Sequence, residues 1–443
     1  MLSKEDNEVL CRIGPGTLMG NFFRQYWLPA LQSIEVPAPD SPPVRIRLLG
    51  EELIAFRTTS GDVGLIQSAC PHRGASLFFG RNEEEGLRCV YHGWKFDTAG
   101  ACVDMPSEPA ESNFKSKVRA TAYRTCQRNG IIWAYLGPRE VPPPLPELEG
   151  NMHPTYRITV LHRSNNWMQG WEGEMDTIHA AFLHFGATRN EDTEPGSLQY
   201  YETRNRSGKF SVRDTEHGTS YSMIRTAEED SYYHRIGHML FPCFAMVPPA
   251  PLLRRNPGFI AYVPMDDYHT LEWGVNALLE DGGITAGTGI VQGATRAGGV
   301  GREYLPNTSG WHGRYNISQT FANDFLIDRE AQRTWKSYTG INGIRQQDMA
   351  MTESMGPIMD RTREHLGTTD QLIIRTRRRL VACAKALQEH GTVPPGVNHP
   401  EVYHQRSGGI VLPRNVDWWD GTKEIRARFE AARAVEAAPV VGS

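Results

Sequence analysis

The stretch 70–97 reads CPHRGASLFFGRNEEEGLRCVYHGWKFD and contains two short motifs that each combine one cysteine with one histidine. The first is C-x-H, with Cys70 and His72, and sixteen residues separate it from the C-x-x-H of Cys89 and His92. Two thiolates and two imidazoles on paired loops can hold two iron ions unequally, with the cysteines on one ion and the histidines on the other. That arrangement defines a Rieske [2Fe-2S] cluster, which the stretch therefore predicts.

A structural zinc site is the alternative for the same four residues, because two thiolates and two imidazoles also satisfy a tetrahedral ion. Zinc sites usually place their ligands as C-x2–4-C and H-x3–5-H, whereas each motif here supplies one cysteine and one histidine. Both loops are also rich in glycine, at Gly74, Gly80 and Gly93, which indicates surface connections. The mixed arrangement favours the [2Fe-2S] cluster.

Size and composition describe an ordinary globular protein. With 443 residues, the chain exceeds what one hydrophobic core usually organises, so we expect two domains. The net charge of −4 argues against a nucleic-acid binder, which needs clustered lysine and arginine. Residues 1–10 carry four charges and no apolar signal core, and no apolar run reaches the roughly 20 residues of a membrane span. We expect a cytoplasmic protein whose seven cysteines are thiols or metal ligands.

The chain divides at a proline-rich stretch. Short β-prone runs separated by polar or glycine breaks fill residues 44–68, and a further run covers 131–136. Residues 142–146 (PPPLP) cannot continue a helix or a ladder, because proline lacks the N–H and fixes φ. We therefore expect an all-β domain with an N-terminal extension in residues 1–145, and a larger domain in residues 146–443.

The larger domain mixes strand and helix patterns. Residues 156–161 are typical of a strand, and residues 198–263 of several strands joined by turns. Residues 172–184 and 370–388 have helical spacing of apolar side chains, while 281–301, rich in glycine, alanine and threonine, is expected to be a mobile loop. The sequence predicts an α+β fold in which an antiparallel sheet is flanked by helices.

The cysteine/histidine stretch resembles the Rieske domain of ring-hydroxylating oxygenases and, more narrowly, of the phthalate dioxygenase family. The resemblance extends over nearly the whole chain, through MLSKEDNEVL, GPGTLMG and CVDMPSEPAESNFK. It implies an oxygenase α subunit in which the Rieske domain precedes a catalytic domain with one mononuclear Fe(II). The motif alone also occurs in electron-transfer proteins, so a Rieske carrier without oxygenase activity is the competing hypothesis.

Activation of O2 requires Fe(II) with open coordination positions, held on one face by two histidines and a carboxylate. The segment NNWMQGWEGEMDTIHAAFLH supplies His179 and His184. Five residues of a regular helix rotate by about 500°, so both rings reach one ion only if the helix bulges or ends between them. The spacing is similar to that of the Rieske oxygenases and is not the H-E-x-x-H of zinc peptidases. We predict that both histidines bind iron.

The third iron ligand must be a carboxylate. In QQDMAMTE, Asp348 follows an amide pair and precedes Glu353, which resembles the late helix that carries this ligand in the family. We therefore predict Asp348. The alternatives downstream of the histidines are Asp324, Asp328, Glu330 and Glu353.

Asp176 precedes His179 by three residues and can accept a hydrogen bond from it, the usual task of a carboxylate beside a ligand histidine. The resemblance implies that this aspartate lies between the two metal centres and connects to a Rieske histidine of a neighbouring chain. It thereby predicts a homotrimer or a stacked homohexamer. Many relatives have an asparagine in the preceding turn, where this chain has Glu172-Gly173-Glu174, a departure from the family pattern.

Aromatic acids are the common substrates of the family that the chain resembles. A buried carboxylate needs a charged and preferably bidentate partner such as arginine. Arg225 and Arg235 lie within strand-like runs, unusual places for arginine unless it is paired. We consider this pair for carboxylate recognition, with surface ion pairing as the alternative. The expected substrate is an aromatic carboxylate such as phthalate, isophthalate or a chlorobenzoate.

The predicted reaction is cis-dihydroxylation of the aromatic acid, with monooxygenation or O-demethylation of a methoxylated acid as the alternative. There is no G-x-G-x-x-G after a strand and no four-cysteine ferredoxin motif in the sequence. Electrons are therefore expected from NADH through a separate flavin- or ferredoxin-type reductase. A zinc-stabilised scaffold, which would be colourless, is a third interpretation.

Overall fold

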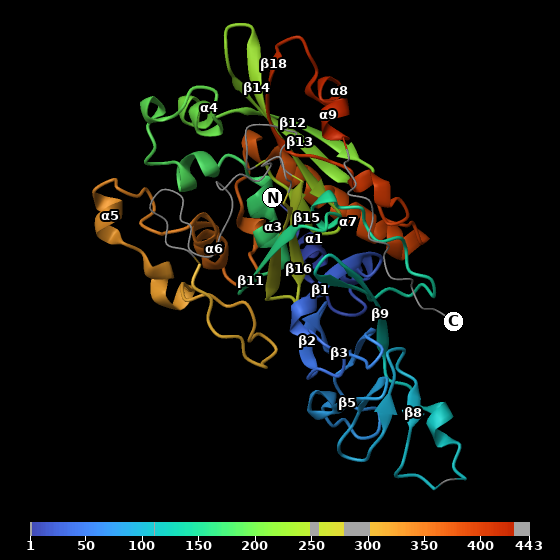
Figure 1. Cartoon of the computed structure of the whole chain (residues 1–443). Helices are drawn as coiled ribbons and strands as arrows, with labels where there is room; N and C mark the ends of the chain where they lie inside the picture. The colour runs from blue at the N-terminus through green and yellow to red at the C-terminus, as the bar shows by residue number, and fades with distance from the viewer. Residues whose placement is uncertain (1, 110, 249–256, 279–301, 429–443) are drawn as a thin grey trace.

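The computed structural model describes residues 2–109, 111–248, 257–278 and 302–428. The expected loop at 281–301 lies outside the described residues. The described strands form three antiparallel sheets, two in the first third of the chain and one in the remainder (Figure 1).

The first part of the chain is all-β, as predicted. Six strands form one sheet in the order β1-β10-β9-β4-β3-β2, and four short strands form a second sheet in the order β5-β6-β7-β8. The bounds in the six-stranded sheet are β1 (Trp27–Gln32), β2 (Val44–Leu48), β3 (Glu51–Arg57), β4 (Val63–Gln67), β9 (Ala122–Arg128) and β10 (Ile131–Tyr135). Those in the four-stranded sheet are β5 (Arg81–Glu83), β6 (Gly86–Arg88), β7 (Lys95–Phe96) and β8 (Cys102–Asp104). The small sheet carries the cysteine/histidine loops and lies at the lower end of Figure 1.

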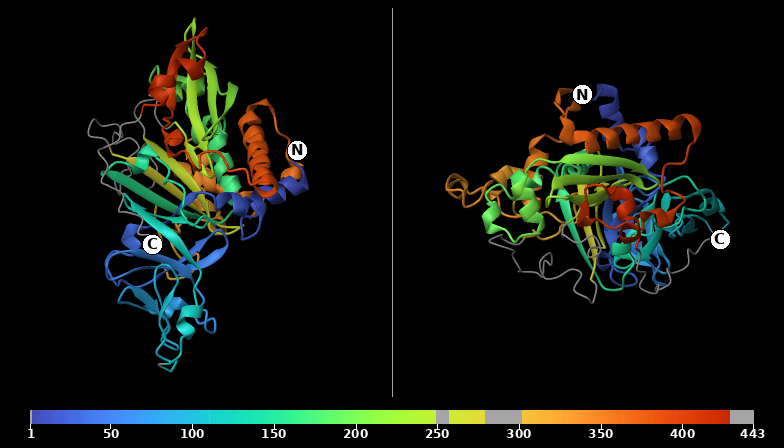
Figure 2. Two further views of the ribbon diagram at one scale, coloured as in Figure 1. Left: turned by 90° about the vertical axis from the view of Figure 1, so that its right-hand side faces the viewer. Right: turned by 90° about the horizontal axis from the view of Figure 1, so that it is seen from above.

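The second part is built on an eight-stranded antiparallel sheet with the order β11-β17-β16-β15-β14-β13-β12, in which β18 also pairs with β14. The strands are β11 (Tyr156–Arg163), β12 (Lys209–Thr215), β13 (Gly218–Thr226), β14 (Ser231–Leu240), β15 (Phe244–Met246), β16 (Gly258–Pro264), β17 (Thr270–Ala277) and β18 (Gly408–Pro413). Helix α3 (Trp167–Met175) packs against β16, and helix α7 (Gln371–His390) packs against β12 and β13 (Figure 2). This is the predicted α+β arrangement.

The prediction of one continuous helix over residues 172–184 is wrong. Helix α3 ends at Met175, and only the π-helical turn η5 (Ala180–His184) follows. The break has a local cause: the Asp176 carboxylate accepts the backbone N–H groups of Ile178 and His179. A side chain that binds nearby backbone donors offers the chain an alternative to the helix.

The expectation of strands from residue 198 onward needs a similar correction. Residues Leu198–Arg204 form helix α4, whose first turn is capped by the hydroxyl of Ser197, which accepts the N–H of Tyr200. The strands begin at Lys209. The remaining helices are α1 (Lys4–Cys11), α2 (Leu18–Phe23), α5 (Arg329–Arg333), α6 (Ile344–Ser354), α8 (Trp418–Gly421) and α9 (Lys423–Arg426). Over the described ranges, no helix combines the length and apolarity needed to cross a bilayer.

The proline-rich stretch connects the two parts without separating their cores. The indole N–H of Trp27 donates to the carbonyl of Pro143 at 2.7 Å. Helices α1 and α2, at the start of the chain, both pack against α7 near its end. One hydrophobic cluster therefore includes residues from both parts. The division into 1–145 and 146–443 stays a prediction.

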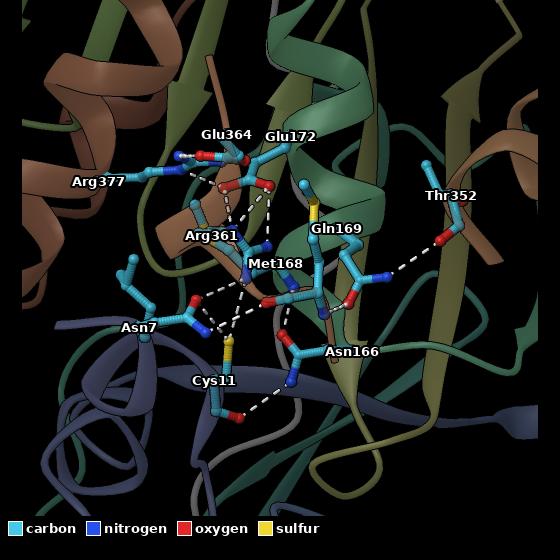
Figure 3. A network of polar contacts seen from close by, with 12 residues as sticks. Asn7, Cys11, Asn166, Met168, Gln169, Glu172, Thr352, Arg361, Glu364 and Arg377 are labelled. Atoms are coloured by element: carbon cyan, nitrogen blue, oxygen red, sulfur yellow. Dashed lines mark hydrogen bonds and ion pairs between the residues drawn. The ribbon is translucent and has the colours of Figure 1, made fainter. Parts of the chain in front are cut away.

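A buried ion-pair network ties α3 to both ends of the chain (Figure 3). The Glu172 carboxylate binds Arg361 at 2.8 Å and Arg377 at 2.5 Å. The guanidinium of Arg361 reaches further, to Asn7 Oδ1 and Cys11 Sγ on α1. Burial alone would raise the pKa of Glu172, but the two guanidinium groups outweigh it and hold that pKa below its ordinary value. Glu172 is thus a buried anion whose removal leaves buried cations with too few partners.

Replacing Glu172 by glutamine should lower the free energy of unfolding by about 3–5 kcal/mol at neutral pH, because the change breaks a buried ion pair from one side. The folded-state pKa lies below the ordinary value of 4.5, so this stabilisation is present above pH 4.5 and is lost as the pH falls through the folded-state pKa. Thermal unfolding of both proteins between pH 3 and pH 8 measures it. The matched control is Glu330→Gln, in an exposed pair with Arg333, where a much smaller effect is expected because solvent screens the pair. Equal effects of both changes at pH 7 would contradict the assignment.

Candidate metal centres

The two cysteine/histidine loops have the same backbone structure. The N–H of Gly74 donates to the carbonyl of Cys70, and the N–H of Gly93 donates to that of Cys89, both at 2.9 Å. Both glycines have positive φ, +76° and +81°, a conformation that other residues rarely adopt. The chain therefore presents its two thiols on paired, equivalent turns.

The side chains on these turns fit a metal cluster. Cys70 and Cys89 are each 3% exposed, and both are free thiols in the described structure. The rings of His72 and His92 lie with their centroids 4.4 Å apart, and His72 Nδ1 is buried without a hydrogen-bond partner among the described residues. Burial raises the pKa of Cys70 to about 11, so its thiolate needs a cation beside it. A metal cluster supplies that positive charge.

The H-x4-H pair is brought together by a π-helical turn. The N–H of Phe185 donates to the carbonyl of Ala180, five residues earlier, at 3.0 Å. This wider turn replaces the regular rotation that would point the two rings apart. The rings of His179 and His184 lie with their centroids 5.0 Å apart, close enough to share an ion.

Asp348, on α6, completes a group of three ligand atoms. His179 Nε2 lies 3.2 Å from His184 Nε2, and Asp348 Oδ1 lies 3.4 Å from the first nitrogen and 3.2 Å from the second. Metal bonds of about 2.0–2.2 Å at right angles separate neighbouring ligand atoms by about 3 Å. The three atoms therefore fit one face of a single ion and leave its other positions open.

The alternative carboxylates are engaged elsewhere. Asp328 caps α5 by accepting the N–H of an alanine in its first turn, and Glu330 forms an exposed ion pair. Glu353 accepts the backbone N–H of Ser164. Asp324 is exposed and lies in a 3-10 segment. Of the carboxylates considered from the sequence, the structure brings only Asp348 to the two histidines.

Sequence reasoning missed Gln347, which orients His184. Its Oε1 lies 2.7 Å from His184 Nδ1, and its Nε2 donates to the carbonyl of Ile341 at 2.9 Å. Because a carbonyl can only accept, the amide nitrogen must face Ile341 and the amide oxygen must face the imidazole. His184 therefore carries its proton on Nδ1, and the lone pair of Nε2 faces the ligand group. The sequence shows an amide pair before Asp348, but it does not show that either amide contacts a histidine.

Charged side chains behind Asp348 form a second buried network. Arg345 lies 3.8 Å from Asp348 Oδ2, contacts Glu174 on α3, and lies 3.3 Å from Glu272. Arg163 binds the other oxygen of Glu272 at 2.6 Å. Although burial opposes it, interactions with the two neighbouring imidazoles hold the pKa of Asp348 far below its ordinary range. Asp348 is therefore anionic, as a ligand must be.

Asp176 lies beside the ligand group without binding its histidine side chain. Its Oδ2 is 3.9 Å from His179 Nδ1, beyond hydrogen-bond reach, so the expected bond between the two side chains is absent. The carboxylate instead holds the backbone of the turn, and 37% of the side chain is exposed. An exposed carboxylate at this place is accessible to a neighbouring chain.

Arg225 and Arg235 both face one buried carboxylate, that of Glu202. Arg235 Nη1 lies 2.7 Å from Glu202 Oε1 and also contacts Thr177, whereas Arg225 Nη1 lies 3.8 Å from the same oxygen. Two cations against one anion leave a positive charge in excess. Among the described residues, neither terminal nitrogen of Arg225 has a hydrogen-bond partner.

Comparison with known proteins assigns both parts of the chain. Residues 26–121 match the Rieske [2Fe-2S] domain, and residues 134–438 match the model described as LigXa C-terminal domain like. The chain is 45% identical to the 3-chlorobenzoate-3,4-dioxygenase oxygenase subunit of Comamonas testosteroni, over 94% of this chain and 97% of the relative. It is 34% identical to the phthalate 4,5-dioxygenase oxygenase subunit of Pseudomonas putida, over 95% and 94%. It is 32% identical to the 5,5'-dehydrodivanillate O-demethylase oxygenase subunit of a Sphingobium species, over 86% and 80%.

A solved structure supports the fold. The terminal oxygenase of carbazole 1,9a-dioxygenase from Nocardioides aromaticivorans superimposes with a TM-score of 0.53 and 17% identity, covering 86% of this chain and 97% of that one. Because the likeness covers 86% of this chain, it includes residues from both parts of the fold.

Replacing Gln347 by leucine should weaken Fe(II) binding about 10- to 100-fold, because His184 would lose the partner that fixes its tautomer and ring orientation. The expected change is measured as Fe(II) retained against a chelator under anaerobic conditions. Gln346→Leu is the matched control, since the neighbouring amide binds Gln319 and not a histidine. Unchanged retention in the Gln347 variant, or equal loss in both, would show that the amide does not orient the ligand.

Proposed function

We propose that this chain, which belongs to the Rieske non-haem iron oxygenases, is a terminal oxygenase that cis-dihydroxylates an aromatic carboxylate. One observation carries the proposal: the ligand atoms of His179, His184 and Asp348 converge within 3.4 Å in a chain that also has the Rieske loops. The relatives named for 3-chlorobenzoate and phthalate support an acid as substrate.

The residues proposed for the two centres divide the work between them. Cys70, His72, Cys89 and His92 would hold the [2Fe-2S] cluster, and His179, His184 and Asp348 would hold the mononuclear Fe(II). When bound, the Fe(II) supplies the position at which O2 is reduced with electrons delivered by the cluster. The protein's own contribution is to keep both imidazole lone pairs and one carboxylate charge directed at the same point. The exposed face of Asp176 remains available to a neighbour.

The shape of the molecule supports electron delivery between neighbouring chains. The β5–β8 sheet lies at one end of the folded molecule, whereas α3, α4 and α6 lie far from it (Figure 1). We propose a homotrimer, or a stack of two trimers, in which Asp176 faces a Rieske histidine of the next chain.

Terminal oxygenases of this kind work with a ferredoxin or reductase partner. For this chain we propose an NADH-dependent reductase and a cytoplasmic location, where NADH is available.

The excess positive charge around Glu202 supports carboxylate recognition. Arg235 also contacts Thr177, one residue after Asp176, which relates this cation to the segment carrying His179. A substrate carboxylate would balance the charge that Glu202 leaves unpaired. We therefore propose Arg235, with Arg225 behind it, as the group that attracts the acid.

O-demethylation is the second candidate, because the chain is also 32% identical to an O-demethylase subunit. The two reactions differ in how much oxygen from O2 enters the aromatic product. Dihydroxylation places two labelled atoms in the ring product. Demethylation leaves none there, because one labelled atom leaves with the methyl carbon as formaldehyde and the other becomes water.

A panel of chlorobenzoates, phthalates and methoxybenzoates, incubated with reductase, NADH and labelled O2, tests the function. We expect a dihydrodiol of a chlorobenzoate or phthalate with two labelled atoms, and about three irons per chain, two from the cluster and one from the facial site.

Asp348→Ala should lose turnover and about one iron per chain while keeping the visible spectrum of the cluster. Asp324→Ala, at an exposed position, is the control. If Asp348→Ala retains iron and turnover, Asp348 is not the ligand; if no panel member is oxidised by iron-replete enzyme, the substrate class is wrong.

Replacing Arg235 by methionine should lower kcat/KM for the acid about 10- to 100-fold, because a charge-assisted hydrogen bond is lost. Activity toward an uncharged methyl ester of the same acid should change much less. Glu202→Gln is the control, since it removes the internal ion pair and keeps the cation. If kcat/KM falls equally for the acid and the ester, Arg235 does not bind the substrate carboxylate and only pairs with Glu202.

A further inference from the structure

A second group of metal-ligand side chains lies outside the two centres described above. Asp266 and His269 occupy the turn between β16 and β17, and His312 lies in the segment that follows residue 302. One ligand atom from each of the three lies within 4.8 Å of the others. His269 Nδ1 is 2.9 Å from Asp266 Oδ1, and His312 Nε2 is 3.8 Å from Asp266 Oδ2.

A fourth side chain, His162 at the end of β11, faces the same group. Its ring centroid lies 5.5 Å from that of His269 and 5.6 Å from that of His312. His162 is 7% exposed, and its Nε2 is buried without a hydrogen-bond partner among the described residues. His312 Nδ1 is also buried and unpartnered in the described structure. Buried polar atoms are normally satisfied, so two unpartnered imidazole nitrogens beside a carboxylate indicate a missing partner.

The composition of the group suits a cation. Imidazole rings lie beside one carboxylate, and imidazole nitrogens and carboxylate oxygens are common ligands of transition-metal ions.

Neighbouring charges only partly oppose a cation. Arg47 on β2 lies 3.0 Å from Asp266 Oδ2, but the contact does not have hydrogen-bond geometry. Arg47 also lies 3.8 Å from Glu52, which balances part of its charge. The side chains of His269 and His312 are 30% and 33% exposed, so an ion has a path from solvent.

We propose that Asp266, His269 and His312, with the buried ring of His162 beside them, form a binding site for a divalent transition-metal ion of the zinc type. Ligand atoms around tetrahedral zinc, with bonds of about 2.0–2.2 Å, lie about 3.3–3.5 Å apart, between the two separations found here. Imidazole donors favour zinc over Ca²⁺ or Mg²⁺, which prefer oxygen.

The site lies where the two parts of the chain meet, which gives the ion a structural task. The turn between β2 and β3 binds the end of β16, with Gly50 N–H donating to the carbonyl of Met265 at 2.8 Å. On the other side, Arg45 on β2 donates to Ser309 and packs over Trp311, next to His312. A bound ion would connect β11, the β16–β17 turn and the 302–318 segment beside the Rieske strands.

Zinc uptake by the iron-replete protein tests the proposal. Full-length protein is equilibrated with micromolar Zn²⁺ under anaerobic conditions, and zinc and iron are counted in the same sample. We expect about one zinc per chain with iron unchanged, and an X-ray absorption spectrum with nitrogen and oxygen ligands at about 2.0–2.2 Å. Mg²⁺ and Ca²⁺ should not compete. No zinc uptake, or uptake matched by an equal loss of iron, would overturn the assignment.

Two variants locate the zinc. His312→Ala and Asp266→Asn should each reduce zinc uptake to near zero while the iron content and the cluster spectrum stay unchanged. His399→Ala, an exposed histidine paired with Glu401, is the matched control and should bind zinc as the parent does. If one variant fails to fold, which the cluster spectrum would reveal, the other decides the question. Undiminished zinc uptake in a folded variant would place the ion elsewhere. Because iron is counted separately, the outcome is independent of the proposed oxygenase activity.

Discussion

The structure depends on the requirement that two histidines five residues apart direct their lone pairs at one point. A regular helix cannot meet it, because the second ring would point well away from the first. The chain meets it by ending α3 at Met175 and resuming as a π-helical turn, so that His179 and His184 face Asp348. Asp176 lies at the break, and its carboxylate holds the turn by accepting the backbone N–H groups of Ile178 and His179.

Helix α3 positions this turn because it is fixed on two sides. Glu172 and Glu174 are two residues apart on α3 and therefore point in different directions. Glu172 binds Arg361 and Arg377, which connect α3 to both ends of the chain, whereas Glu174 binds Arg345 on α6, one turn before Asp348. Each buried charge would be costly alone, so the networks favour the arrangement of the helices in which the charges are paired. The ion pairs that hold the helices thereby also hold the three proposed iron ligands in place.

The fold was largely predictable where the information is local. The cysteine/histidine loops, the antiparallel strands and the helix at 370–388 follow from short-range patterns, and the need for a bulge between His179 and His184 follows from helix geometry alone. Helix α4 was missed because the Ser197 cap and a few buried side chains stabilise a short helix within a region whose sequence pattern is typical of strands. Gln347, Arg345 and the Asp266 group act through contacts between segments far apart in sequence. No spacing within one segment reveals such contacts, so they required the structure.

The central claim is that one chain holds an iron-sulfur pair and a solitary Fe(II) with open positions. Nitric oxide added anaerobically to the iron-replete, substrate-bound protein tests it most directly, because the gas binds Fe(II) only where a coordination position is open. We expect an electron paramagnetic resonance signal from the solitary ion, equal in amount to the reduced cluster in the same sample. Iron-replete protein that shows the cluster signal but no response to nitric oxide would contradict it.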